Sequence, residues 1–597
     1  MVAYGATALM RATSCSIADI QAALRAEMES TPEYGVFKIT KVTPTNQGLL
    51  LDLHGKPIHG ADTATSLTDD FLNTRACFYN PDKGSATVSQ VDLKNNQIQL
   101  KNLKGARPLV GRDILLYPRN FIKPVLTCWE DVDLANQAIA CLNDLAHPVP
   151  IKSQPLYALK HSYLRPAQRQ ALNLVTHSAS FLLGPPGTGK TTTLGVTIAE
   201  FLVADPGACV LLVTTSNLAV DQALISVDKA LESMNETGVR FQLRRIGNGY
   251  DRSLYVGREH LLPVKQAYGT DEDETGGDAY DTATSTLDST CIGDAGGTVR
   301  LQAMTIACCI ARLRKLDKFD LVVFDEASQI SLAHTLLVMP LGKARLFAGD
   351  PEQLAPIAKS NAKNVQRWLT RSAFAFMPTT GPSICFLNEQ SRMAGPICTI
   401  VSEIFYNGKL RVADNALADP NWFKYRSRNM GHISGDEHVS IQRITSNASR
   451  TRERNGWIRQ ESAQRAIDLT LSALREGHAS QSDIVIITPY RLQRAYLLDQ
   501  LYLLELPRIK VSTVHSCQGS EAPFVIFDPV RADDEFMMNK VGRQLINVAF
   551  SRAQAKLIVM LSAQDLQNPI LAQMVAIVDR ITKPMAQVLA TSELPAA

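Results

Sequence analysis

The stretch "FLLGPPGTGKTTT", residues 181–193, decides how the rest of the chain is interpreted. Its first three residues predict a short buried strand, residues 184–189 a tight loop, and the residues from Lys190 onward a helix. This order matches the phosphate-binding P-loop pattern G-x-x-x-x-G-K-[ST]. The backbone N–H groups of such a loop, with the helix N-terminus, form a cradle for anionic phosphates. The stretch therefore predicts a nucleoside triphosphate site, and the alternative is a chance match in a loop rich in Gly and Pro.

The residues of this loop have separate expected roles. Gly187 and Gly189 permit backbone angles and a close approach that a Cβ would forbid. Lys190 is expected to reach the β- and γ-phosphates, and the hydroxyl of Thr191 to bind Mg²⁺. The expected nucleotide-binding residues of the loop are Gly184, Pro185, Pro186, Gly187, Thr188, Gly189, Lys190, Thr191 and Thr192.

Length and composition indicate a globular chain of several domains. Of the 597 residues, 45% are hydrophobic and 20% are charged, which provides apolar material for several cores. A run of about eighteen apolar residues is absent, and the start "MVAYGATALMRATSCS" does not predict a signal peptide. The net charge of +3 neither indicates nor excludes a polyanionic partner. Eleven scattered cysteines without a C-x-x-C pair predict reduced thiols and no structural metal. We expect a cytoplasmic protein, or a nuclear one if the source is eukaryotic.

Residues 1–150 predict an accessory domain that is a barrel on helices. Residues 17–29 have the helical spacing of apolar positions, and residues 129–146 return to it. Between them, from about 36 to 121, short alternating runs are separated by Gly, Asn and Pro, with a hairpin turn expected at Asn95–Asn96. Five or so such strands predict a small β-barrel. An unrelated β-rich N-terminal domain is the alternative.

From Lys160 onward, predicted strands and helices alternate, which favours parallel sheets of the RecA-like α/β class. One set of strands is "SFLLG", "CVLLVTT", "LVVFDEA" and "ARLFAGD", and a second set is "DIVIITPY", "KVSTVHS", "FVIFDPV" and "KLIVMLS". We expect two RecA-like P-loop domains in tandem, over residues 151–380 and 381–597, with a cleft between them. The acidic segment 267–297 cannot bury much surface, and it is either a passive linker or a partner-binding insertion.

Two further stretches place polar side chains directly after predicted strands. In "LVVFDEASQ", residues 321–329, Asp325 fits a group that helps to hold Mg²⁺, and Glu326 fits one that orients or deprotonates the attacking water. On its own the pair would be a solvated strand end, but the P-loop upstream favours the catalytic interpretation. In "AGDPEQLAP", residues 348–356, Gln353 belongs to a loop that would sense the γ-phosphate.

Two arginines are expected to complete the site from outside the first domain. Arg392 lies in "FLNEQSRMAGP" and Arg552 in "LINVAFSRAQ". An arginine aimed at the transferring phosphoryl group stabilises charge in the transition state. Either one alone would more often be a surface salt-bridge partner.

Taken together, these stretches resemble superfamily 1 helicases, in order from about residue 160 to 565. The segments similar to the adenine-reading Gln motif and to motifs Ia, II, III, IV, V and VI are, in this order, "LRPAQRQAL", "VTTSNLAVDQAL", "DEAS", "GDPEQL", "QSRM", "VSTVHSCQGSE" and "NVAFSRA". Within the superfamily, "SNLAVDQ", "FYNGKL" and "ITPYRLQ" are most similar to the 5′→3′ group. That group includes the nonsense-mediated-decay helicase and the nidovirus helicases.

The resemblance implies further residue roles. Gln168 would read adenine, and Gly519 and Glu521 would line the ribose and phosphate edge of the nucleotide. Gln353 would couple the nucleotide state to the gap between the domains. Arg392 and Arg552 would reach the γ-phosphate across the cleft. The implied contacts to a nucleic-acid strand are Ser216, Asn217, Thr305, Pro489, Tyr490, Thr513 and His515. Their hydroxyl, amide and backbone groups suit phosphate contact without base reading; Tyr490 would stack a base or belong to the core.

Two residues depart from the family pattern. Ser391 stands where the family usually has an aromatic that stacks on the nucleobase, so we expect loose selectivity for adenine. His515 stands where the decay-factor group has Asp and the RecD-like branch has His, so the subfamily stays open. The N-terminal module matches the family's accessory module in position. We expect no zinc-binding domain before it, which removes one basis for a viral replicase role.

The resemblance implies an ATP-dependent helicase or translocase, 5′→3′ on single-stranded DNA or RNA, that unwinds duplexes. The alternative is a nucleotide-gated clamp that remodels nucleic acid or a protein complex without processive unwinding, since it would share every ATP motif. Contacts to phosphates serve DNA and RNA equally. Protein partners would bind through the acidic insertion or the N-terminal module, and no membrane partner is expected. An intrinsic nuclease is not expected, while a partner nuclease stays open.

Overall fold

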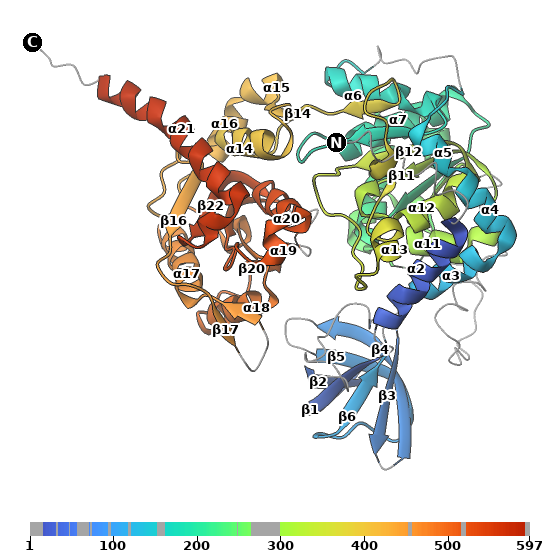
Figure 1. Cartoon of the computed structure of the whole chain (residues 1–597), viewed down its shortest axis with the longest axis horizontal. Helices are drawn as coiled ribbons and strands as arrows, with labels where there is room; N and C mark the ends of the chain where they lie inside the picture. The colour runs from blue at the N-terminus through green and yellow to red at the C-terminus, as the bar shows by residue number, and fades with distance from the viewer. Residues whose placement is uncertain are drawn as a thin grey trace, which may run out of the picture.

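The chain folds into a barrel and two parallel sheets, which lie apart in Figure 1 with the barrel below the first sheet. This computed structural model describes residues 16–31, 34–46, 48–55, 71, 74–80, 82–92, 97–117, 121–151, 161–247, 249–263, 299–451, 456–514, 517 and 521–591. The acidic segment 267–297 and the turn expected at Asn95–Asn96 lie outside these ranges. Within them, no helix has both the length and the apolar character needed to cross a membrane.

Six strands in the described ranges form a closed antiparallel barrel in the order β1-β2-β5-β4-β3-β6. They are β1 (Gly35–Thr45), β2 (Gly48–Gly55), β3 (Arg75–Asn80), β4 (Asp82–Asp92), β5 (Gln97–Gly105) and β6 (Asp113–Leu116). The predicted barrel is confirmed, since alternate residues such as Phe37 and Ile39 point into its core. The prediction missed β3. Its sequence "RACFYN" places the large side chain of Phe78 in the core, but apolar and polar residues do not alternate clearly along it.

Four helices attach the barrel to the first sheet. They are α2 (Ser16–Ser30), α3 (Ile122–Glu130), α4 (Val132–Ala140) and α5 (Leu142–Ala146). The indole of Trp129 is buried and donates to the carbonyl of Ala333 at 3.1 Å, and the carboxylate of Glu27 accepts from the backbone N–H of Lys359 at 2.8 Å. The helix expected over 129–146 is divided. Asp131 caps the start of α4, because its carboxylate accepts from the backbone N–H groups of Asp133 and Leu134.

The first sheet has seven parallel strands in the described ranges, in the order β13-β7-β12-β11-β8-β10-β9. They are β7 (Ser180–Leu183), β8 (Val210–Thr214), β9 (Leu243–Arg245), β10 (Leu301–Thr305), β11 (Phe319–Phe324), β12 (Gly342–Gly349) and β13 (Ile384–Phe386). The edge strand β13 comes after residue 380, so the first sheet extends past the domain boundary that we expected there. The boundaries themselves stay predictions.

Helices cover both faces of this sheet. One face carries α6 (Pro166–Ala171), α7 (Lys190–Ala204) and α8 (Asn217–Ser233); the other carries α11 (Ile306–Ala311), α12 (Leu332–Val338), α13 (Lys363–Trp368) and the helices that hold the barrel. Such doubly covered parallel strands are nearly continuous runs of apolar residues, as in β8 and β11. This arrangement brings the carboxyl ends of all seven described strands to one edge.

The second sheet has five parallel strands in the described ranges, in the order β16-β22-β21-β19-β20. They are β16 (Val439–Arg443), β19 (Ile484–Thr488), β20 (Lys510–Thr513), β21 (Ala522–Phe527) and β22 (Ala553–Leu561). Its long helices are α14 (Gly395–Phe405), α17 (Gln460–Arg475), α18 (Arg491–Leu503), α20 (Lys540–Phe550) and α21 (Pro569–Thr591). Shorter elements are α15 (Asp414–Leu417), α16 (Pro420–Arg426), α19 (Glu535–Met538), β14 (Glu389–Gln390), β15 (Arg411–Val412), β17 (Ser449–Thr451) and β18 (Gly456–Ile458). The predicted pair of parallel α/β units is confirmed.

Candidate nucleotide site and strand contacts

The P-loop joins β7 to α7 and follows a path that its glycines permit. Gly187 and Gly189 have φ of 76° and 75°, in the left-handed region. A Cβ on Gly184 would lie 2.7 Å from the side chain of Lys190, and one on Gly189 would lie 2.7 Å from the amide nitrogen of Gln168. The loop therefore wraps closely around the two side chains that the sequence predicts to bind nucleotide.

Lys190 lies between the two carboxylates that follow β11. Its Nζ donates to Asp325 Oδ1 at 2.6 Å and to Glu326 Oε1 at 2.8 Å. Burial opposes the charge on Lys190, but Asp325 and Glu326 outweigh this effect and raise the pKa of the ammonium. Burial likewise opposes the charge on Glu326, but Lys190 outweighs it and lowers the pKa of that carboxyl. The parallel sheet thus brings Lys190 to two adjacent carboxylates that lie 135 and 136 positions away in the sequence.

The donor set beside Lys190 suits a magnesium–nucleotide complex. Thr191 lies in the first turn of α7, and Asp325 is the buried carboxylate at the end of β11. Hydroxyl and carboxylate oxygens are the hard ligands that Mg²⁺ prefers. A protein usually supplies one or two such oxygens, and the phosphates of the substrate supply others. The loop backbone that Gly187 and Gly189 permit fits a phosphate chain. The assignments of Thr191 and Asp325 to metal stay predictions.

Gln168 connects α6 to the P-loop. Its Oε1 accepts from the backbone N–H of Arg165 at 2.9 Å, and its Nε2 donates to the carbonyl of Thr188 at 3.0 Å. The side chain is buried, and both polar atoms already have partners. Reading a base would use the second N–H and the second lone pair of this amide, whose orientation the two bonds fix.

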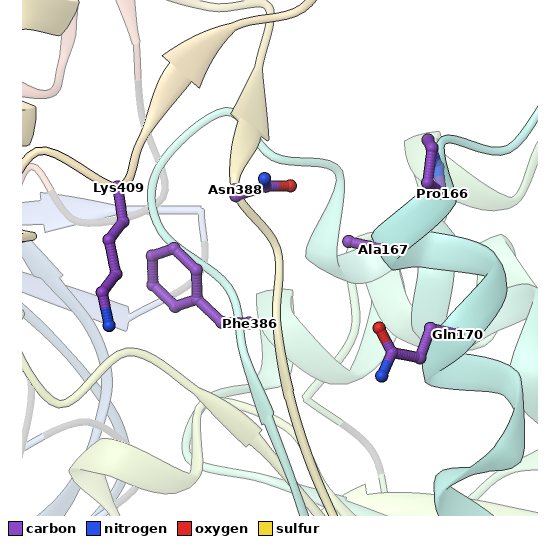
Figure 2. Close-up of a pocket in the computed structure, with 6 residues that line it drawn as sticks. All are labelled: Pro166, Ala167, Gln170, Phe386, Asn388 and Lys409. Atoms are coloured by element: carbon purple, nitrogen blue, oxygen red, sulfur yellow. The ribbon is translucent and has the colours of Figure 1, made fainter. Parts of the chain in front are cut away.

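A cavity of about 470 Å³ lies beside α6 and is bordered by both domains (Figure 2). It is lined by Pro166, Ala167, Gln170, Phe386, Asn388 and Lys409. Figure 2 shows the amide of Asn388 directed toward α6 and the amide of Gln170 directed toward Phe386. Gln168 is absent from this lining and turns instead to the P-loop. The sequence did not predict the cavity, because its walls come from segments more than 200 residues apart.

The loop after β12 forms side-chain hydrogen bonds with residues of the second domain. Gln353 donates from Nε2 to Asp350 Oδ2 at 2.8 Å and accepts at Oε1 from Arg552 Nη2 at 3.2 Å. Asp350 also accepts from the hydroxyl of Tyr406 at 2.6 Å, and Tyr406 in turn accepts from Asn547 of α20 at 2.9 Å. Burial raises the pKa of Asp350 to about 6. Sequence reasoning found Gln353 and Arg552 but missed Tyr406, although it lies in the quoted segment "FYNGKL".

Arg392 lies directly against the P-loop. The preceding residue, Ser391, donates its backbone N–H to the carbonyl of Gly187 at 3.1 Å, and a Cβ on Gly187 would lie 2.5 Å from the Cβ of Arg392. The guanidinium of Arg392 forms an ion pair with Glu521, whose other oxygen accepts from Gln554 at 2.8 Å. Glu521 therefore contacts Arg392, while its expected place at the ribose stays a prediction. Gly519, expected beside it, lies outside the described residues.

Arg552 is the more deeply buried of the two arginines. Burial, and then the nearby charge of Arg392, lower the pKa of its guanidinium to about 10. Arg552 is also near enough to Glu326 for the two charges to interact. Three cations, Lys190, Arg392 and Arg552, thus converge on the P-loop from two domains.

Several of the expected strand-contact residues share one edge of the first sheet. Thr214 and Thr305 are register partners at the ends of β8 and β10, so Ser216 and Thr305 lie at neighbouring strand ends. Both hydroxyls cap helices: Ser216 accepts from Ala219 N at 3.2 Å and Thr305 from Cys308 N at 3.3 Å. Their place at the start of helices fits contact with phosphate.

The neighbouring Asn217 is held by Arg245, which forms a buried ion pair with Asp221. The Oδ1 of Asn217 accepts from Arg245 Nη2 at 2.7 Å, and Arg245 Nε donates to Asp221 Oδ1 at 2.9 Å. The hydroxyl of Tyr255 donates to the same oxygen of Asp221 at 2.7 Å. Asp221 belongs to "SNLAVDQ", but the sequence does not reveal that its partners are Arg245 and Tyr255.

The expected strand contacts of the second domain also lie at adjacent strand ends. Thr488 and Thr513 are register partners on β19 and β20, and Pro489 and Tyr490 follow β19. The hydroxyl of Tyr490 donates to the carbonyl of Arg531 at 2.8 Å, and its ring packs edge-on against Phe536 at 5.4 Å. These contacts favour a packing role for Tyr490 over base stacking. His515 lies outside the described residues.

Comparison with known families covers most of the two sheets. A model described as "AAA domain" matches residues 168–359, and a second model with the same description matches residues 369–564.

Comparison with characterised proteins finds several relatives. The chain is 25% identical over 426 residues to the mouse "DNA replication ATP-dependent helicase/nuclease DNA2", which covers 68% of this chain and 38% of that protein. It is 28% identical over 422 residues to the protein of the same name from Xenopus laevis, covering 66% and 37%. It is 26% identical over 413 residues to the "Regulator of nonsense transcripts 1 homolog" of Neurospora crassa, covering 65% and 36%. The matched region is thus little more than a third of the length of each of these relatives.

Among solved structures, one similar chain is the Arterivirus nonstructural protein 10 (helicase) in complex with DNA. The TM-score is 0.39 and the identity 13%, over 85% of this chain and 78% of that one.

Proposed function

The chain belongs to the superfamily 1 helicases, of the type that includes DNA2 and the nonsense-mediated-decay helicase, and on this premise we propose that it is an ATP-dependent nucleic-acid helicase. The observation that carries the proposal is the convergence of Lys190, Arg392 and Arg552 on one P-loop beside Asp325 and Glu326. Three cations from two domains around a phosphate cradle suit the charge of a transferring phosphoryl group.

In the proposed reaction, the residues of the first domain hold the triphosphate and the water. The phosphate oxygens compete with Asp325 and Glu326 for Lys190 Nζ, and this releases Glu326 Oε1. The released carboxylate of Glu326 then accepts a hydrogen bond from the attacking water. Mg²⁺, held by Thr191 and Asp325, would neutralise charge on the β- and γ-phosphates when bound.

The second domain would respond to the γ-phosphate through its arginines. Arg392 exchanges its ion pair with Glu521 for the phosphate, and Arg552 approaches from its bond with Gln353. Loss of the γ-phosphate then returns both side chains to protein partners. The bonds from α20 to the loop after β12, through Asn547 and Tyr406, carry that change between the sheets.

The nucleic-acid strand would run along the carboxyl edges of both sheets. Ser216 and Thr305 on the first sheet, and Pro489 and Thr513 on the second, would contact phosphates. When the gap between the sheets closes and opens, the two sets of contacts alternate in their grip on the strand. The 5′→3′ direction is proposed from the segments "SNLAVDQ" and "ITPYRLQ". One named relative acts in DNA replication and another concerns nonsense transcripts, so the substrate is proposed as single-stranded DNA or RNA.

The test is a strand-displacement assay beside a streptavidin-displacement assay. We expect ATP-dependent separation of 5′-tailed duplexes, in DNA, RNA or both, at one fixed salt concentration. A protein that hydrolyses ATP on strands but displaces neither a strand nor streptavidin would be the nucleotide-gated clamp. Separation of 3′-tailed duplexes only would overturn the direction.

The same assay tests the barrel. Gly35 of β1 and Leu116 of β6 are register partners, so the chain enters and leaves the barrel at neighbouring points. Removal of the barrel therefore leaves two chain ends that a short linker can join. Deletion of residues 36–121 should retain much of the strand-stimulated ATP hydrolysis and impair duplex separation. Full unwinding by this variant would reduce the barrel to a docking platform.

A further inference from the structure

Helix α16 packs on the backbone turn that carries Arg392. Arg426 donates from Nη2 to the carbonyl of Ser391 at 2.7 Å and to that of Arg392 at 2.7 Å, and from Nε to the carbonyl of Arg392 at 3.0 Å. The indole of Trp422 donates to the carbonyl of Ser391 at 2.7 Å. Two side chains one helical turn apart therefore bind two consecutive carbonyls. The Nη2 group alone reaches both carbonyls, and the rigid guanidinium adds the second bond from Nε to the carbonyl of Arg392.

The guanidinium of Arg426 binds this turn through Nη2 and Nε, while Nη1 donates to the carbonyl of Trp422 at 3.2 Å. Arg426 is 7% exposed, and in the described ranges no carboxylate forms an ion pair with it. Its guanidinium instead stacks 4.0 Å above the ring of Trp422. Burial lowers the pKa of Arg426 to about 10, which still leaves it charged at neutral pH. A buried charge is costly unless fixed dipoles satisfy it, so the carbonyls of Ser391 and Arg392 are strongly held in place.

The other side of the same turn is held as firmly. Gln390 is fully buried, and its Oε1 accepts from the backbone N–H groups of Arg392 and Met393, both at 2.7 Å. The N–H of Ser391 donates to Gly187 of the P-loop at 3.1 Å. With its N–H groups bound by Gln390 and Gly187 and its carbonyls bound by Arg426, the turn has little freedom to rotate.

We propose that Arg426, stacked on Trp422, is a positioning residue that fixes the backbone of Arg392 for phosphoryl transfer. The inference rests on the proposed function, since it assigns Arg426 to the same site. Arg426 acts through Arg392: without its three hydrogen bonds the carbonyl of Arg392 loses both of its bonds to Arg426, only Gln390, Gly187 and Trp422 among the described residues still hold the turn, and the guanidinium of Arg392 moves. A misplacement of about 1 Å in a catalytic group costs on the order of 10²-fold in rate.

The test is a double-mutant cycle in the full chain, read as kcat and KM for strand-stimulated ATP hydrolysis. Arg426→Ala should lower kcat by about tenfold or more with KM for ATP within about twofold of the wild type. Arg426→Lys keeps the charge but not the fork, and should recover part of the loss. In the Arg392→Ala background, Arg426→Ala should cost less than about twofold more, because the group it positions is gone.

Arg428→Ala is the matched control. This arginine follows α16 but donates to His478 and Asp483, away from the turn, and should leave kcat unchanged. Equal strand affinity and melting temperature in Arg426→Ala and Arg428→Ala show that the kinetic loss is not a folding defect. If Arg426→Lys is also unaffected and Arg426→Ala hydrolyses ATP like the wild type, or if the two losses add in the double variant, the positioning role is wrong. If Arg392→Ala itself is fully active, the failure belongs to the proposed function instead.

Discussion

Each of the two parallel sheets places a cation between two carboxylates at its carboxyl edge, and the two arrangements differ in how completely the cation is bound. In the first sheet, Lys190 lies between Asp325 and Glu326 under a glycine-rich loop. In the second sheet, Arg459 lies between Asp528 and Asp565.

The lysine retains freedom that the arginine lacks. Lys190 binds its two carboxylates, and the side chain of Glu326 is about a third exposed. Arg459 also donates to Ser562 and to the carbonyl of Met560, and both of its carboxylates are fully buried. In both cases burial opposes the positive charge and the carboxylates outweigh it, so each cation has a raised pKa. The same pairing therefore leaves one carboxylate partly exposed in the first domain and is fully enclosed in the second.

The largest expected effect is that of Lys190→Ala. The substitution removes the cation that would hold the phosphates, so ATP turnover should fall to background while the fold persists. Steady-state hydrolysis with a saturating strand, beside a thermal melt, measures both. Near-normal turnover would show that this loop is not the site of hydrolysis.

Arg459→Ala should show the opposite pattern. Removing one partner of a buried ion pair leaves Asp528 and Asp565 buried without their cation, which costs about 3–5 kcal/mol of unfolding free energy. Chemical denaturation of the purified protein measures this cost. The control is Arg428→Ala, whose partly exposed pair with Asp483 should contribute no more than about 1 kcal/mol. Similar losses in both variants would remove the distinction between the enclosed pairing and an ordinary ion pair.

Asp350 provides a third case, a buried carboxylate at the carboxyl edge of the first sheet that accepts from the neutral side chains of Gln353 and Tyr406 and from the backbone N–H of Glu352. Its pKa is raised from 3.8 to about 6 in the folded protein, so the folded state binds the proton more tightly than the unfolded state. Its stabilising contribution is complete below about pH 4 and is lost as the pH rises through 6. The raised pKa corresponds to about 3 kcal/mol.

Asp350→Asn mimics the protonated form, so the difference in unfolding free energy between wild type and variant should change between pH 4 and 6 and be constant above it. Asp483 provides a control of opposite sign, because burial raises its pKa but Arg428 and Ser480 lower it further. The contribution of Asp483 is lost as the pH falls. A pH-independent difference for Asp350→Asn would show that this carboxyl titrates normally.

The parts of the site that the sequence predicts are those whose signal is contiguous. Strand, loop and helix of the P-loop lie within thirteen residues, and Asp325 and Glu326 end a strand that the pattern of apolar residues identifies. The tandem sheets follow for the same reason, since buried parallel strands are unbroken apolar runs.

The sequence does not predict partners that the fold brings together from distant segments. Glu521 binds Arg392 and Arg426 binds the turn beside it, yet neither pairing has a local pattern. The strands β9 and β13 were missed because three residues carry too little periodicity, and the five-residue strands β10 and β16 were missed because polar residues interrupt their apolar runs. The strand β3 was missed because its apolar content is low.

The smallest expected effect concerns the base end of the nucleotide site. Ser391 offers no ring to stack on a nucleobase, and a missing stacking contact forgoes roughly 1 kcal/mol, or about fivefold in affinity. GTP and CTP should therefore be hydrolysed within about tenfold of ATP, as kcat/KM at a saturating strand. Ser391→Tyr restores a ring at this half-buried position and should increase the preference for ATP by a similar factor, mainly through KM. The backbone bonds of Ser391 to Gly187 and Arg426 do not depend on its side chain, so the variant should keep the kcat of the wild type for ATP. Strict dependence of the wild type on ATP would show that Gln168, together with contacts other than a stacked ring, is sufficient to select the base.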